Sequence, residues 1–131
     1  CAVLTAEQLA AYIRLADGLG LSCLVEAHDE VALQAALKSG ARVVGVNNRN
    51  LKDFTVNFEN SLRLRAQAPP NVLFVAESGV QTTADVGRLR AGGVDAVLVG
   101  EALMRTPDKA AALAAEQDPW PIAPKASVAL V

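Results

Sequence analysis

The sequence predicts an α/β fold in which helices alternate with parallel strands, as in one half of a (β/α)8 barrel. Four apolar, strand-forming runs end near residues 26, 47, 77 and 99, at intervals of 21, 30 and 22 residues. A helix-forming segment follows each run, and the runs alternate little between apolar and polar residues, as parallel strands covered by helices do. Four such units are half of an eight-stranded barrel, which has about 250 residues. A doubly wound open sheet is the competing architecture, although no Gly-x-Gly-x-x-Gly motif follows a strand.

The first two helices have clear start signals. Thr5 and Gln8 form a capping box, in which each side chain bonds to the backbone of the other residue. Apolar residues then recur at helical spacing until a pair of glycines ends the helix. A strand follows over residues 22–26, and Asp29 caps a second helix that runs to about Lys38.

The centre of the chain contains the longest predicted connection. A strand over residues 42–47 leads into a loop over residues 48–55. That loop is longer than most βα connections, and long loops are often functional. A third helix is expected from Asn57 or its neighbour to about Gln67, and a proline-containing turn follows it.

The next βα unit repeats the same pattern. A strand is predicted over residues 72–77, followed by a helix that starts after Thr82 or Thr83 and ends at Ala91, before two glycines. The last strand is predicted over residues 95–99.

The chain is expected to form one barrel segment and a tail. Thr106 and Pro107 have the pattern of the N-cap and first residue of a final helix that ends near Glu116. Residues 1–116 are therefore predicted to be the half-barrel. Residues 117–131 contain several prolines and are predicted to be irregular.

Composition narrows the classes of function. The chain has 131 residues, is 52% hydrophobic and 20% charged, and carries a net charge of −2. These values predict a globular cytoplasmic protein with no nucleic-acid or membrane partner. One histidine and two scattered cysteines cannot assemble a metal cluster. Because the chain opens on Cys1 and not on Met, we expect it to be part of a longer protein.

Three polar residues occupy corresponding places at the ends of successive strands. Glu26, Asn47 and Glu77 each complete an otherwise apolar series on one face of a strand. If that face points into a barrel, they converge on the C-terminal rim, where barrel enzymes have their active sites. Otherwise they are strand-end groups turned to solvent. Glu26 is the candidate for proton transfer, because a carboxyl group at an apolar mouth can have a raised pKa.

Two glycine-bearing strand ends predict a phosphate site. Ser78 and Gly79 follow one strand, and Gly100 and Glu101 follow the next. Glycine lets backbone N–H groups approach a ligand closely, and the last two strands of a barrel commonly hold a phosphate in this way. Arg49 could hold an anion from the long loop, or it could be an ordinary surface arginine. A small phosphorylated substrate is therefore expected.

Four motifs resemble indole-3-glycerol-phosphate synthase, in order and with the expected spacing over about residues 3–116. They are Leu-Val-Glu-Ala-His-Asp, Gly-Val-Asn-Asn-Arg-Asn-Leu, Val-Ala-Glu-Ser-Gly-Val and Val-Leu-Val-Gly-Glu-Ala-Leu-Met-Arg. The resemblance implies the last four βα units of a (β/α)8 barrel. It also implies a carbon–carbon lyase of tryptophan biosynthesis that needs no metal or organic cofactor. The family closes the indole ring of 1-(2-carboxyphenylamino)-1-deoxyribulose 5-phosphate, with loss of carbon dioxide and water.

The resemblance also implies roles for individual residues. Glu26 matches the general base of the dehydration, Asn47 the asparagine that positions the substrate, and Glu77 the glutamate of strand seven. Substrate-binding positions correspond to Arg49, Ser78 and Leu98, the last forming an apolar wall for the anthranilate ring. The backbone phosphate cradle corresponds to Gly79, Gly100 and Glu101.

One part of the family's machinery is missing from the sequence. The resemblance places the general-acid lysine on an earlier strand, and Lys38, Lys52 and Lys109 read as surface, loop or helix positions. Ring closure needs a proton donor or cation where negative charge develops. The chain alone is therefore expected to be nearly inactive and to need an N-terminal half-barrel as its partner.

Two other hypotheses about the function of the chain remain open from the sequence. A different phosphate-binding barrel, such as a phosphoribosyl-anthranilate or ribulose-phosphate isomerase, would also carry two glycine turns. Alternatively, the chain is an inactive half-barrel module that associates with itself through its open sheet edges and apolar inner face.

Overall fold

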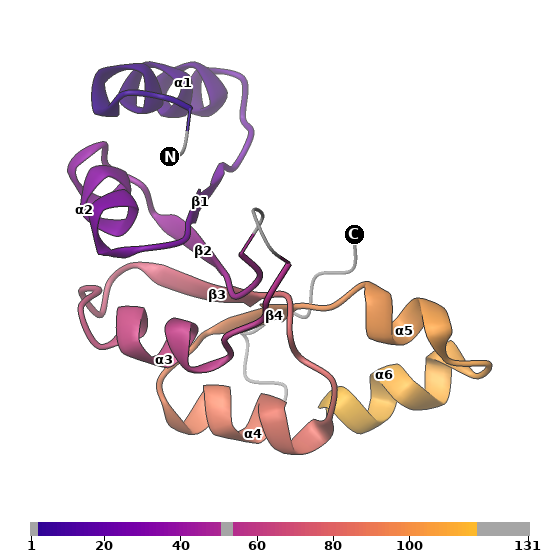
Figure 1. The fold of residues 1–131 in the computed structure, drawn as a ribbon. Coiled ribbons are helices and arrows are strands. Elements are labelled where there is room, and N and C mark those ends of the chain that lie inside the picture. The colour runs from indigo at the N-terminus through magenta and orange to yellow at the C-terminus, as the bar shows by residue number, and fades with distance from the viewer. Residues whose placement is uncertain (1–2, 51–53, 118–131) are drawn as a thin grey trace.

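The computed structural model describes residues 3–50 and 54–117, which form one parallel sheet and the helices that connect its strands (Figure 1). The strands are β1 (Leu24–Ala27), β2 (Val43–Asn47), β3 (Leu73–Glu77) and β4 (Ala96–Leu98). The helices are α1 (Ala6–Gly18), α2 (Glu30–Lys38), α3 (Glu59–Arg65), α4 (Thr83–Ala91), α5 (Glu101–Arg105) and α6 (Lys109–Gln117). Four parallel βα units are thus confirmed, and each strand is one or two residues shorter than predicted.

The strands lie in the order β1-β2-β3-β4, which is their order along the chain. A doubly wound sheet reverses its strand order at a switch point, whereas a barrel adds each strand beside the previous one. The sequential order therefore favours a barrel segment over the open-sheet alternative.

The two faces of the sheet are in different environments. Side chains on one face are buried against the helices, and Figure 1 shows α2, α3 and α4 along that side. The fully buried members of this face include Val44, Val46, Phe74 and Ala76. On the other face, Leu24 is 46% exposed and Leu73 is 47% exposed. The sheet therefore has one packed face and one face on which some apolar side chains are about half exposed to solvent.

N-cap residues in the sequence mark where most of the helices begin. The capping box of Thr5 and Gln8 is present, and the side chain of Asp29 accepts a hydrogen bond of 2.7 Å from the backbone N–H of Ala32. Thr82 is the N-cap of α4 and forms a second capping box with Asp85. These bonds satisfy donors that a helix leaves unpaired in its first turn.

The predicted start of the last helix is wrong. The Thr106 hydroxyl donates to the carbonyl oxygen of Ala102 at 3.0 Å, which ties Thr106 to the end of α5. Asp108 instead accepts from the backbone N–H of Ala111 at 3.0 Å and precedes α6. The Thr-Pro pair therefore lies in the connection between two helices.

Some predictions fall outside the described residues. Those for Cys1, Lys52 and the tail beyond residue 117 concern segments of which the structure gives no description. Within the described segments, no helix is long and apolar enough to cross a membrane.

Candidate functional site

The strand register brings the predicted rim residues to one edge of the sheet. Asn47 on β2 pairs with Glu77 on β3, and Glu77 pairs with Leu98 on β4. Glu26 on β1 pairs with Gly45, which precedes Asn47 by two residues. Because the strands are parallel, their carboxyl ends form a continuous edge, and Glu26, Asn47, Glu77 and Leu98 all lie along it.

Glu77 is the buried carboxyl group of this edge. It is only 6% exposed, and its Oε1 atom has no hydrogen-bond partner among the residues that the structure describes. Burial, which has the largest effect, together with the like charge of Glu26 and a side-chain hydrogen bond with it, raises the pKa of Glu77 to about 7. Burial disfavours the charged form of a carboxyl group, so near neutral pH Glu77 exists partly as the protonated acid.

Asn47 is oriented by the chain that follows it. Its Oδ1 atom accepts a hydrogen bond of 3.0 Å from the backbone N–H of Arg49. This bond turns the Nδ2 amide toward Glu26, whose Oε1 atom lies 3.5 Å away. The Asn47 amide thus adjoins Glu26 at the rim.

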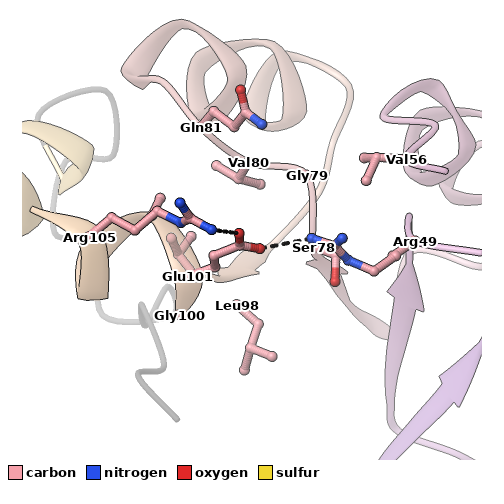
Figure 2. Close-up of a pocket in the computed structure, with 12 residues that line it drawn as sticks. Arg49, Val56, Ser78, Gly79, Val80, Gln81, Leu98, Gly100, Glu101 and Arg105 are labelled. Carbon is pink, nitrogen blue, oxygen red and sulfur yellow. Dashed lines mark hydrogen bonds and ion pairs between the residues drawn. The ribbon is translucent and has the colours of Figure 1, made fainter. Parts of the chain in front are cut away.

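A pocket of about 710 Å³ lies beside this edge, at the ends of β3 and β4. Its lining includes all six residues that the sequence predicts for substrate and phosphate binding (Figure 2). They are Arg49, Ser78, Gly79, Leu98, Gly100 and Glu101. The lining also includes Arg105 and Val56, which were not among the predicted site residues.

Two arginines hold the carboxylate of Glu101 in this pocket. Arg49 Nη2 lies 2.9 Å from Glu101 Oε2, and Arg105 Nη2 lies 3.0 Å from Glu101 Oε1. Figure 2 shows the two arginines extending toward Glu101 from opposite sides. Arg49 is two-thirds buried, so it is less screened by solvent than a surface arginine. The pocket therefore contains two guanidinium groups, both paired with the Glu101 carboxylate.

The turn after β3 requires glycine at its second position. Ser78 and Gly79 have φ angles of +61° and +77°, in the left-handed region that favours glycine. A Cβ atom on Gly79 would also lie 2.4 Å from Val56 Cγ1. Gly79 therefore lets the turn and the long loop approach each other closely.

Asn48 is a site residue that the sequence analysis missed. Only 3% exposed, it donates from Nδ2 to the Ser78 carbonyl oxygen at 3.1 Å. Its Oδ1 atom accepts hydrogen bonds from the backbone N–H and the hydroxyl of Ser61, at 3.1 and 2.8 Å. Asn48 thus joins β2, α3 and the phosphate-site turn. Its position directly after a buried strand was the available signal.

Across residues 3–50 and 54–117, no group of three or more His, Cys, Asp or Glu residues is placed to hold a metal ion.

The sequence of the chain matches a known protein family. The family described as indole-3-glycerol phosphate synthase matches residues 1–115. The chain belongs to this family. The family's fold is the TIM barrel, and its members are lyases of tryptophan biosynthesis. The match to the synthase family favours that reading over a different phosphate-binding barrel.

Individual relatives agree with this assignment. Indole-3-glycerol phosphate synthase of Ruminiclostridium cellulolyticum is 55% identical over 114 residues, which is 87% of this chain and 44% of that protein. The synthase of Leuconostoc mesenteroides is 54% identical over 112 residues, 86% of this chain and 43% of that protein. The chain therefore spans less than half the length of these relatives.

A solved structure supports the fold alone. A chain in the crystal structure of the Amycolatopsis orientalis BexX/CysO complex superposes with a TM-score of 0.65 at 19% sequence identity. The match covers 87% of this chain and 47% of that one.

Proposed function

We propose that this chain forms the last four βα units of an indole-3-glycerol phosphate synthase barrel. The complete cytoplasmic barrel would close the indole ring of 1-(2-carboxyphenylamino)-1-deoxyribulose 5-phosphate and release carbon dioxide and water. One observation carries the proposal: Glu26 and Glu77 lie at the same sheet edge as an arginine-lined pocket beside two glycine turns. Acid–base groups are thus placed next to a site for a phosphorylated substrate.

The two glutamates suit different steps of proton transfer. Glu26 is exposed at the rim and is the proposed base that removes the proton lost in the dehydration. Glu77, with its pKa raised to about 7, holds a proton near neutral pH and can donate a hydrogen bond to a substrate hydroxyl. Asn47, fixed by the backbone N–H of Arg49, would orient the substrate between them.

The adjoining pocket would hold the rest of the substrate. Backbone N–H groups of Gly79, Gly100 and Glu101 are the proposed phosphate ligands, with Ser78 beside them. Arg49 would supply positive charge to an anionic group of the substrate. Leu98, whose side chain lies at the edge of the pocket in Figure 2, would form an apolar wall for the aromatic ring.

The proposed general acid lies outside this chain. Lys38 is exposed at the end of α2, and Lys109 is exposed on α6. Neither lysine lines the pocket beside the carboxyl groups. The chain alone would therefore be nearly inactive, and lysine-bearing strands of a complementary half-barrel would complete the site.

The open face of the sheet favours association. Leu24 and Leu73 are about half exposed on the face that would line the barrel interior. In the complete barrel, the other four strands would cover this face and pair with β1 and β4. Without them, the same face and edges favour self-association of the chain. Sedimentation of the chain at high concentration tests this, and a monodisperse monomer would contradict it.

Complementation tests the function. The chain is produced together with the N-terminal half of the Ruminiclostridium cellulolyticum relative, and formation of indole-3-glycerol phosphate is measured. We expect turnover with both halves and almost none with either half alone. A folded complex that binds the substrate but produces no indole-3-glycerol phosphate would refute the proposal. Turnover of a phosphoribosyl-anthranilate substrate instead would identify the isomerase reaction.

A further inference from the structure

Gly45 lies in the interior of β2, between the two glutamates of the rim. A glycine in a strand interior loses backbone entropy and has no side chain to pack, so it weakens the strand. The φ angle of Gly45 is outside the left-handed region, and a backbone requirement therefore does not explain it. The space beside Gly45 explains why a glycine stands at this position. A Cβ atom there would lie 1.9 Å from Glu77 Oε1 and 2.9 Å from Glu77 Cδ.

The side chain of Glu77 thus occupies the place of a missing side chain on the neighbouring strand. Glu77 itself pairs with Asn47, so its carboxyl group leans back over β2 toward Gly45. Glu26 pairs with Gly45 from the opposite side. Strands β1 and β3 are not neighbours, and two strand spacings separate them by about 10 Å. Their carboxyl groups can interact only across β2.

We propose that Gly45 is a positioning residue, whose missing side chain lets Glu77 cross β2 so that the carboxyl groups of Glu26 and Glu77 form one proton-sharing pair. The catalytic use of the pair rests on the proposed function, but the pairing itself does not. Two carboxyl groups can form a hydrogen bond only when one of them carries a proton. One proton held between Glu26 and Glu77 therefore couples their titrations.

The surroundings of Glu77 agree with this arrangement. Its register partners, Asn47 on β2 and Leu98 on β4, are neutral. The like charge that acts on Glu77 comes from Glu26, together with a side-chain hydrogen bond from the same residue. Burial of the Glu77 carboxyl group against Gly45 supplies the larger effect on its pKa. Under this proposal, both effects depend on the carboxyl group reaching the space beside Gly45.

The Gly45→Ala variant tests the proposal directly. The full 131-residue chain is labelled with ¹³C at the glutamate side-chain carboxyl carbons, and the titration of Glu77 is followed by NMR. We expect its midpoint to fall from about 7 toward the ordinary value of 4.5, because the added methyl group displaces the carboxyl group into solvent. Glu26→Gln should lower the midpoint only in part, since burial remains. An unchanged Glu77 midpoint in folded Gly45→Ala would overturn the proposal.

Matched variants separate positioning from general damage to the sheet. Gly87→Ala adds a methyl group on α4 where nothing lies within 4 Å, and it should leave the Glu77 midpoint unchanged. If Gly45→Ala does not fold, the Gly45→Ala, Glu77→Ala double variant decides. It should fold and melt close to Glu77→Ala alone, because the blocking carboxyl group is gone and the other near neighbour, Leu24 Cδ1 at 3.2 Å, is the end of a flexible, half-exposed side chain. Failure of the double variant to fold would contradict the proposal.

The outcomes also distinguish this inference from the proposed function. The titration needs no substrate, whereas the complementation assay measures turnover. The expected shift without turnover would retain the carboxyl pair and refute the synthase reaction. Turnover without the shift would support the synthase reaction and refute the carboxyl pair.

Discussion

The side-chain amide of Asn48 donates a hydrogen bond of 3.1 Å to the carbonyl oxygen of Ser78, 30 residues further along the chain. Through this bond the end of β2 holds the turn after β3 in its left-handed conformation. The backbone supports the same contact, since the N–H of Asn48 donates to the Glu77 carbonyl oxygen at 2.8 Å. The proposed phosphate site is therefore fixed by a buried amide that lies outside the pocket lining.

Replacement of Asn48 should destabilise the fold. In Asn48→Ala, the Ser61 donors and the Ser78 carbonyl lose their partner, and each buried unsatisfied group costs about 1–3 kcal/mol. We expect a loss of about 2–4 kcal/mol in the free energy of unfolding, measured with urea. Asn60→Ala is the matched control, because Asn60 is half-buried and bonds at the surface, and it should change stability by about 0.5 kcal/mol or less. Equal effects of the two variants would show that Asn48 contributes no more to the free energy of unfolding than Asn60 does.

Glu77 should make stability fall as the pH rises. Its pKa is about 7 in the folded chain and 4.5 ordinarily, so the folded state binds the proton more tightly. This stabilisation is complete below pH 4.5 and is lost as the pH rises through 7. It corresponds to about 3 kcal/mol. Between pH 4.5 and 8, the unfolding free energy of the chain should fall by about 3 kcal/mol more than that of Glu77→Gln. Parallel curves would refute the raised pKa.

Arg49 should govern affinity for anionic substrate groups. In the assembled barrel, Arg49→Ala removes one guanidinium from the pocket and leaves the Glu101 carboxylate less neutralised. A lost charged hydrogen bond of about 1.5–3 kcal/mol predicts a KM roughly 10- to 100-fold higher, with a smaller change in kcat. Arg90→Ala, on the exposed side of α4, serves as the control and should leave KM unchanged. A KM for Arg49→Ala equal to that of the control would exclude Arg49 from binding.

Local signals in the sequence predicted most of the fold. Thr5, Asp29 and Thr82 cap their helices as expected, because an N-cap bonds to residues only a few positions away. The four apolar runs became neighbouring strands because parallel βα units add strands in sequence. The start of α6 was missed because Thr106 and Asp108 both carry N-cap signals. Only the packing of α5 decides between them.

Contacts between distant residues were beyond such reasoning. Arg49 and Glu101 are 52 positions apart, and no local pattern indicates that their side chains pair. Gly45 carries no chemistry of its own, so its relation to Glu77 becomes visible only when β2 and β3 are placed side by side. The strand-end pattern was enough to select Glu26, Asn47 and Glu77 as candidates. The residues that pair with them could be identified only from the register of the strands.

The turnover of the Glu26→Gln variant tests the central claim most directly. With the complementary half-barrel supplied, this change removes the proposed base and keeps the shape of the side chain. We expect kcat to fall on the order of 10² or more while KM changes little. Glu30→Gln, an exposed change on α2, should retain full activity. Turnover by Glu26→Gln within about twofold of the unmodified complex would contradict the account, because general catalysis contributes at least about 10²-fold.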